Sequence, residues 1–175
     1  MLHRIPRPLI AIAALFVCLT IHELGHVFAA YLTGGTVQDF VVFSLVPHVR
    51  ISAAATPAIK AFRAVSGSAC SLLLCLSILL AVRSNTAVKR IAKDAVTAFA
   101  CVELAGWSIS SLTQTLSSSP DDAQTFLSAS RVSPFTVIAV CALLVAMGVC
   151  LVRIGERRPR PRIEARLRAR AAAAK

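Results

Sequence analysis

Long runs of apolar residues alternate with shorter polar connections along this chain. The runs extend roughly from Pro8 to Leu32, from Phe62 to Val82, from Ala95 to Leu116 and from Pro134 to Val152. Each run is long enough to cross a hydrocarbon layer of about 30 Å as a helix, which rises about 1.5 Å per residue. The pattern therefore predicts an all-α integral membrane protein with about four transmembrane helices.

The connection after the first run shows a different pattern. Gly34-Gly35 ends the apolar run, and TVQDFVVFSLVPHVRIS then brings β-branched and aromatic residues, interrupted at Pro47. Residues of these types favour β-strands, which a proline interrupts. We expect a short β-like segment here, with one or two strands between Val37 and Ile51 at the membrane surface, arranged as a hairpin.

The composition agrees with a membrane protein. Of the 175 residues, 57% are hydrophobic and only 15% are charged, and the mean hydropathy is +0.74. Too few polar residues remain to cover a water-soluble domain of this size, so we expect one membrane-embedded domain over residues 1–152. The six cysteines all lie in apolar segments without a CxxC pair, and we interpret them as small apolar core residues.

Basic residues predict the orientation of the chain. The sequence has 19 basic and 8 acidic residues, and the basic ones gather before the first run, in the second connection and after the last run. With four spans these three segments share one side, which the positive-inside rule assigns to the cytoplasm. We expect a bacterial cytoplasmic membrane with both termini in the cytoplasm, although Arg50, Lys60 and Arg63 lie on the opposite side.

Residues 153–175 form a basic tail that ends in RRPRPRIEARLRARAAAAK. We expect this tail to be cytoplasmic and disordered or partly helical. Anionic lipid head groups attract such a segment, by about 1 kcal/mol for each basic residue near the surface. No aromatic platform or nucleic-acid-binding motif accompanies the charge, so lipid rather than nucleic acid is the expected partner.

Two histidines and a glutamate interrupt the first apolar run in the sequence HELGH. His22 and His26 are four residues apart, so a helix places both imidazoles on one face, one turn apart. There they can share one metal ion, and Glu23 can accept a proton from water that the metal activates. A buried polar cluster between helices is the structural alternative. Because an ionised acid near the centre of a span costs about 2.5–3.5 kcal/mol, such residues usually have a function, and we favour the metal site.

HELGHVFAAYLTGG resembles the first core helix of the site-2 protease family, the intramembrane zinc metalloproteases, with Gly25 inside the motif and a Gly-Gly break after it. AVSGSACSLLL is similar in placement to that family's second core helix, which usually opens with Gly-Pro and carries an Asn shortly after. Gly67 fits this pattern, but Ser68 replaces the Pro. Cys70 or Ser71 stands where the Asn is expected. The resemblance covers the first half of the chain, and HELGH is its specific part.

The resemblance implies that a third metal ligand comes from an aspartate on a later core helix, where the family usually has an Asp-Gly motif. No Asp-Gly occurs in this sequence, and the candidates are Asp121, Asp122, Glu103 and His48. SSSPDDAQTFLSASRVSP is similar to a Ser-Asp-Ala stretch in small divergent members of the group. That likeness maps the ligand onto Asp122.

Depth along the spans also favours the aspartates. Glu103 lies about 12 Å into the third run, against about 21–27 Å for His22 and His26 in the first, so we expect Glu103 to be too shallow and to bond across helices to a Ser or Thr. Ser119-Pro120-Asp121-Asp122 is also typical of a helix start, with Ser119 as N-cap and the acids in the first turn. That start explains both aspartates without a metal. His48 is most simply a surface histidine.

The sequence thus predicts a small divergent zinc metalloendopeptidase that hydrolyses a peptide bond in a membrane-embedded or membrane-adjacent protein. In this hypothesis His22, His26 and Asp122 hold zinc. Glu23 is catalytic, first as general base and then as proton donor to the leaving amine. The partners are the lipid bilayer and a membrane-protein substrate that pairs with the strand-like segment from Val37 to Ile51.

Two alternatives remain open. One is a catalytically silent membrane protein of the same fold that binds partners, and the other is a metal-handling membrane protein. A transporter should carry ionisable residues on several spans at matching depth. The charge pattern places the HELGH end of the first span outside the cytoplasm, whereas the active site of the resembling family usually lies nearer the cytoplasm.

Overall fold

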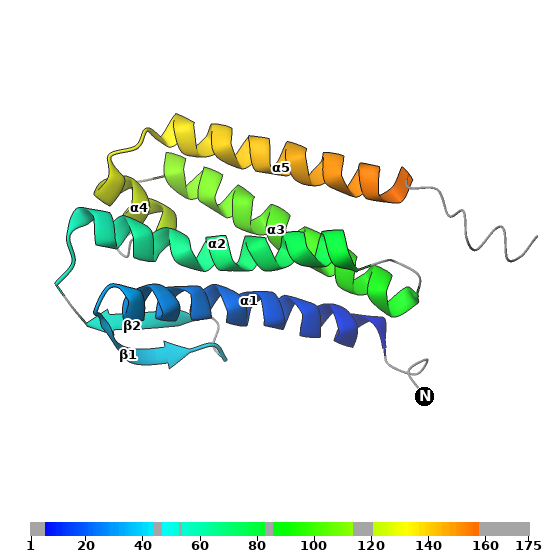
Figure 1. Ribbon diagram of the computed structural model, residues 1–175, viewed down its shortest axis with the longest axis horizontal. Helices are drawn as coiled ribbons and strands as arrows, with labels where there is room; N and C mark the ends of the chain where they lie inside the picture. Colours follow the sequence, from blue (N-terminus) through cyan, green and yellow to red (C-terminus); the bar gives the residue numbers. More distant parts are fainter. Residues whose placement is uncertain (1–5, 44–46, 53, 83–85, 114–120, 158–175) are drawn as a thin grey trace, which may run out of the picture.

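A computed structural model describes residues 6–43, 47–52, 54–82, 86–113 and 121–157. The elements in chain order are α1 (Arg7–Leu32), β1 (Thr36–Val41), β2 (His48–Ser52), α2 (Pro57–Ala81), α3 (Ala87–Leu112), α4 (Asp122–Ser130) and α5 (Pro134–Arg157). The four long helices run side by side, and α4 lies at the end of the bundle opposite the start of α1 and the end of α5 (Figure 1). α1 packs against α2 and α3, and α3 also packs against α5.

The described part of the chain contains four helices that are long and apolar enough to cross a membrane: α1, α2, α3 and the Pro134–Arg153 part of α5. Large apolar side chains on these helices are exposed, among them Val102 (72%), Phe135 (76%) and Leu143 (60%). A water-soluble protein rarely exposes so much contiguous apolar surface, whereas lipid solvates it well. The predicted all-α membrane fold with a short β segment after the first helix is confirmed.

The third span begins earlier than the hydropathy pattern predicted. α3 begins at Ala87 instead of Ala95, and the Thr86 hydroxyl caps it by accepting a hydrogen bond from the Lys89 amide at 3.3 Å. Its first two turns carry basic residues, which a hydropathy window excludes but a helix accommodates at little cost. Every later residue of α3 therefore lies farther from the start of its helix than the sequence pattern indicated.

The predicted hairpin is also confirmed. β1 and β2 pair antiparallel, from Thr36 opposite Ser52 to Val41 opposite His48. A bulge interrupts the register early in β1, as is common in short exposed sheets. The hairpin contacts α1 through both strands, so it lies along the first helix.

A glycine turn connects α1 to this hairpin. Gly34 has a φ of +70°, a conformation that glycine adopts without the steric cost of a Cβ atom. The amides of Gly34 and Gly35 donate to the carbonyls of Tyr31 and Ala30 at 3.2 and 2.8 Å. These two bonds satisfy the last carbonyls of the helix and end it two turns after the HELGH motif.

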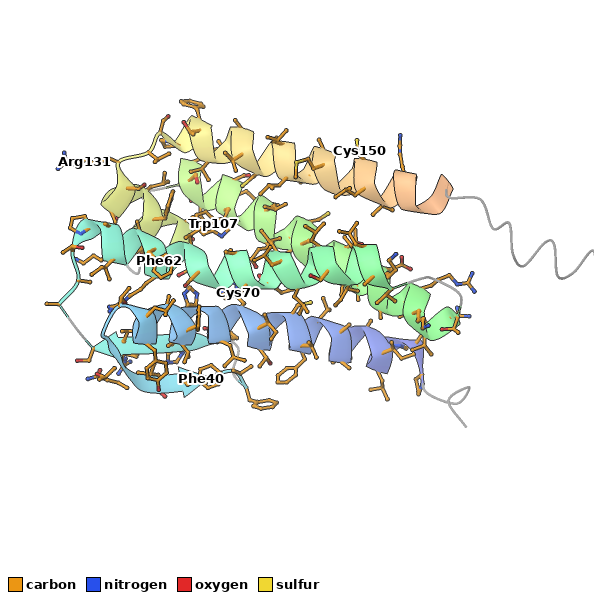
Figure 2. The ribbon with its side chains drawn as sticks, in the orientation of Figure 1. Phe40, Phe62, Cys70, Trp107, Arg131 and Cys150 are labelled. Carbon is orange, nitrogen blue, oxygen red and sulfur yellow. The ribbon has the colours of Figure 1, made fainter. Side chains whose placement is uncertain are left out.

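Two apolar clusters hold the helices together. The first joins α3, α4 and α5 and consists of Leu104, Leu127, Val137 and Cys141. Trp107, on α3, extends it towards α4 (Figure 2). Its ring meets that of Phe126 edge to face, with 5.7 Å between the centroids. The second joins α1, α2 and α3 and consists of Cys18, Cys75 and Val96, so these two cysteines are small apolar core residues, as predicted. The same prediction is wrong for Cys101 and Cys150, which are exposed on the helices. The first cluster fixes the position of α4 and therefore of the residues at its start.

Candidate metal centre

The structure brings the three predicted metal ligands together. The Nε2 atoms of His22 and His26 lie 3.2 Å apart on α1. Asp122 Oδ2, at the start of α4, lies 3.3 Å from His22 Nε2 and 3.0 Å from His26 Nε2. Residues a hundred positions apart in the sequence thus present two nitrogens and one oxygen to a single point.

Close packing of α1 on α2 makes room for this cluster. A Cβ atom on Gly25 would lie 2.5 Å from the Ser66 carbonyl oxygen and 2.9 Å from the Cα of Gly67. A Cβ atom on Gly67 would collide with the Nε2 atoms of both histidines. Small residues that let two helix backbones approach closely are typical of packing in membranes. Here they also leave the space in which the imidazoles meet.

A backbone carbonyl of α2 fixes the His26 ring. His26 Nδ1 lies 2.8 Å from the carbonyl oxygen of Arg63, and because a carbonyl only accepts, Nδ1 carries the proton. In the neutral ring, Nε2 then keeps its lone pair and points into the cluster. The Arg63 side chain is also anchored, since its Nε donates to the Thr33 hydroxyl at 2.8 Å near the end of α1.

A carboxylate of α3 lies against the other ring. His22 Nδ1 is 3.2 Å from Glu103 Oε1, on the opposite side of the imidazole from the atom that faces Asp122. The prediction that Glu103 is too shallow is wrong. α1 and α3 run parallel and start at the same end of the bundle, at Arg7 and Ala87 (Figure 1). His22 lies about 22 Å from the start of α1 and Glu103 about 24 Å from the start of α3, at about 1.5 Å per residue.

Two donors support Glu103. The Ser68 hydroxyl of α2 donates to Glu103 Oε1 at 2.5 Å, which confirms the predicted bond across helices to a serine. The Trp107 indole N–H donates in turn to the Ser68 oxygen at 2.6 Å. The HELGH motif points to neither Ser68 nor Trp107 as part of the site. In the sequence, each is a polar group inside an apolar run.

The start of α4 separates the roles of the two aspartates. Asp121 is the N-cap residue, and its Oδ1 accepts a hydrogen bond from the Gln124 amide at 2.9 Å. The predicted N-cap at Ser119 is therefore wrong by two positions, and Ser119 itself lies outside the described residues. Asp122 follows in the first turn. Burial alone would raise the pKa of its carboxyl, but hydrogen bonds and charge from His22 and His26 lower that pKa to about 2.

Glu23 and His48 lie near the cluster but not in it. Glu23 is 5% exposed and follows His22 directly on α1. His48 is on β2, where its Nε2 lies 3.5 Å from Asp39 Oδ2 and its side chain is 44% exposed. This position agrees with the predicted surface histidine.

The donor set fits zinc. Zinc sites in proteins use imidazole nitrogens and carboxylate oxygens, and ligand atoms about 2.0–2.1 Å from a tetrahedral ion are about 3.3 Å from one another. The separations in the cluster are 3.2, 3.3 and 3.0 Å. Comparisons of the chain with protein-family models, with curated proteins and with solved structures found no match. The functional inference therefore depends on the residues and geometry described above.

Proposed function

We propose that this chain is an intramembrane zinc metalloprotease similar to the site-2 proteases. The observation that carries the proposal is the convergence of His22 Nε2, His26 Nε2 and Asp122 Oδ2 within an apolar helical bundle. The other nitrogen of each ring faces a carbonyl or a carboxylate. That arrangement is typical of metal-binding histidines, because it fixes both the tautomer and the ring orientation.

Each residue then has a defined task. His22, His26 and Asp122 hold zinc, which when bound acts as a Lewis acid that activates water and a carbonyl at neutral pH. The Glu23 carboxylate accepts a proton from the attacking water and donates it to the amine of the leaving peptide. The apolar helices around the site limit access of bulk water, which strengthens every charge interaction inside it.

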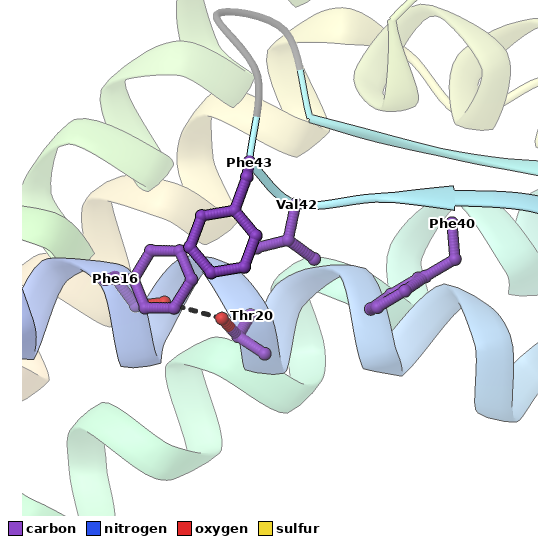
Figure 3. A pocket seen from close by; sticks show the side chains of 5 residues that line it. All are labelled: Phe16, Thr20, Phe40, Val42 and Phe43. Atoms are coloured by element: carbon purple, nitrogen blue, oxygen red, sulfur yellow. Dashed lines mark hydrogen bonds between the residues drawn. The ribbon is translucent and has the colours of Figure 1, made fainter.

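The hairpin offers a surface for the substrate. Each strand of this two-stranded sheet has one edge with no strand partner in the described part of the chain. An unwound peptide can add to such an edge through backbone hydrogen bonds. An apolar groove lies between β1 and α1 and is lined by Phe16, Thr20, Phe40, Val42 and Phe43 (Figure 3). We propose that it receives apolar side chains of a membrane-embedded substrate.

Glu23 favours an enzyme over the alternative of a silent binding protein. A metal held by two histidines and Asp122 needs no ligand from Glu23, and yet this acid is almost fully buried beside them. Burial of an acid is costly, so its retention next to the metal ligands supports a role in proton transfer. The same group has no evident use in a protein that only binds partners.

The proposal is tested by measuring zinc and cleavage on the same protein. We expect full-length protein purified in detergent to hold about one zinc per chain. In liposomes it should cleave some members of a panel of single-span membrane proteins, and a chelator should stop cleavage until zinc is restored. The His22→Ala/His26→Ala double variant is the control. Equal zinc content in the wild type and in this variant would rule out the site.

We also propose a bacterial cytoplasmic membrane with both termini in the cytoplasm. The start of α1 at Arg7, the basic first turns of α3 and the end of α5 near Arg153 lie at one end of the bundle, and α4, which begins at Asp122, lies at the other (Figure 1). The tail beyond residue 157 lies outside the described residues, and its attraction to anionic lipid stays a prediction. Reporter fusions after Lys175 and after Arg131 should report opposite sides of the membrane, with the tail cytoplasmic. An extracytoplasmic tail would contradict the orientation and place the cluster near the cytoplasm.

A further inference from the structure

We propose that Glu103 is a positioning residue that orients His22 for metal binding, and that Ser68 and Trp107 hold Glu103 in place. The inference rests on the proposed metal centre but not on proteolysis. The sequence offered Glu103 as a possible third ligand, and the structure gives it a different place. Its Oε1 faces His22 Nδ1, whereas the metal-facing atom of that ring is Nε2, on the other side.

The direction of the hydrogen bonds supports this role. The Trp107 indole can only donate, so the Ser68 oxygen accepts from it at 2.6 Å and the Ser68 hydroxyl proton is free to point at Glu103. An ionised Glu103 can only accept hydrogen bonds, and its Oε1 lies 3.2 Å from His22 Nδ1, which has no well-aligned hydrogen bond among the described residues. The negative carboxylate at this distance favours the tautomer that carries its proton on Nδ1. The lone pair of the neutral ring is then on Nε2, the atom that faces Asp122.

Two carboxylates lie on either side of the His22 ring. Asp122 Oδ2 is 3.3 Å from Nε2, and Glu103 Oε1 is 3.2 Å from Nδ1. Each end of the ring therefore has its own acidic neighbour, and only the Nε2 end also faces His26. The side chain of Glu103 is only 13% exposed, so water compensates it poorly.

A structural role is the competing explanation, because the bond between Ser68 and Glu103 also joins α2 to α3. The two explanations differ in what they predict for metal affinity. A residue that only joins helices affects the stability of the fold, whereas one that orients a ligand affects the binding of metal to the folded protein. Partners that orient a metal-binding histidine typically change metal affinity by about 10–100-fold.

The test measures zinc affinity of purified full-length variants by competition with a chelator, and thermal melting of the same variants without metal. We expect Glu103→Ala to raise the apparent zinc dissociation constant by about 10–100-fold while about one zinc still binds at saturation. Glu103→Gln should have a smaller effect, because the amide oxygen still accepts a hydrogen bond. Ser68→Ala should have the smallest. Asp94→Asn, which replaces an exposed acid on the same helix, should leave the affinity unchanged.

Cobalt substitution supplies a second readout. Because Glu103 is not a ligand here, Co²⁺-loaded Glu103→Gln should keep the intensity of the visible absorption bands of the wild type. An unchanged zinc affinity in both Glu103 variants, with melting temperatures lowered, would overturn the positioning role in favour of a structural one. Loss of the tetrahedral cobalt spectrum would overturn it in favour of direct ligation.

These outcomes are separable from failure of the protease itself. A wild type that binds zinc with the Glu103 dependence above, but cleaves nothing in the substrate panel, would support the positioning role while removing support for proteolysis. A wild type that cleaves while Glu103→Ala binds zinc normally would support the protease and overturn the positioning role. Absence of zinc from the wild type would overturn both.

Discussion

Asp122→Asn is expected to lose zinc and cleavage together, whereas Asp121→Asn should keep both. Asp122 Oδ2 lies 3.0 and 3.3 Å from the two Nε2 atoms, where it supplies the negative charge of the proposed ligand set. An amide in its place is a neutral and much weaker zinc ligand. We expect the loss of affinity to exceed the roughly 10–100-fold effect typical of a partner that only orients a ligand.

The neighbouring aspartate makes a closely matched control. Asp121 caps α4 by accepting from the Gln124 amide, and asparagine caps helices about as well as aspartate. Both substitutions exchange the same acid for the same amide one residue apart. Zinc content by elemental analysis and cleavage in liposomes would be measured on both proteins. Equal zinc content in the two variants would show that Asp122 is not a ligand and only stabilises the first turn of the helix as an acid.

Much of the fold follows from local rules that act within a few residues. Apolar runs long enough to cross lipid, the Gly34-Gly35 turn and the β-branched segment after it each determine an element almost independently of the rest of the chain. For the same reason HELGH predicted correctly that His22 and His26 lie on one face of a helix, since helix periodicity alone sets that geometry.

The contacts between helices were harder to predict. The predicted depth of Glu103 is wrong because hydropathy places the start of a span where the charges end, whereas the helix itself begins at Ala87, before those charges. A shift of two turns moved Glu103 from a shallow position to one beside His22. A hydropathy pattern indicates which residues can lie in lipid, but it does not indicate which residues form the backbone hydrogen bonds of a helix. Helix ends are therefore the least reliable part of such a prediction.

The supporting groups of the site had little sequence signal. Ser68 stands where the resembling family has a proline, so the sequence pattern marks it only as a departure from that family. Its contact with Glu103 depends on how α2 and α3 pack, which in turn depends on the close approach at Gly25 and Gly67. Such long-range contacts are set by packing and not by the periodicity of any one segment. Nothing in the sequence distinguishes Arg63, whose carbonyl orients His26, from the other basic residues.

Glu23→Gln is expected to abolish most cleavage while leaving zinc bound. Glu23 is not among the three groups that converge on the proposed ion, so the metal does not need it. Glutamine keeps the size of the side chain and much of its hydrogen bonding, but it cannot take a proton from water at neutral pH. A positioned general base typically contributes about 10²–10⁴-fold to the rate, and we expect kcat to fall by about that factor.

The measurement pairs zinc content with cleavage in the same liposome preparation, and Asp121→Asn again serves as the control for exchange of an acid for an amide. Retained zinc with cleavage reduced by about 10²-fold or more would place Glu23 in proton transfer. Loss of zinc in Glu23→Gln would show that the acid holds the metal site together instead. Undiminished cleavage by Glu23→Gln would defeat the mechanism, because no other acid among the described residues is both buried next to the cluster and free of a role in holding it.

A silent binding protein is distinguished by a different result, in which the wild type and Glu23→Gln hold equal zinc and bind the same membrane proteins but neither cleaves them.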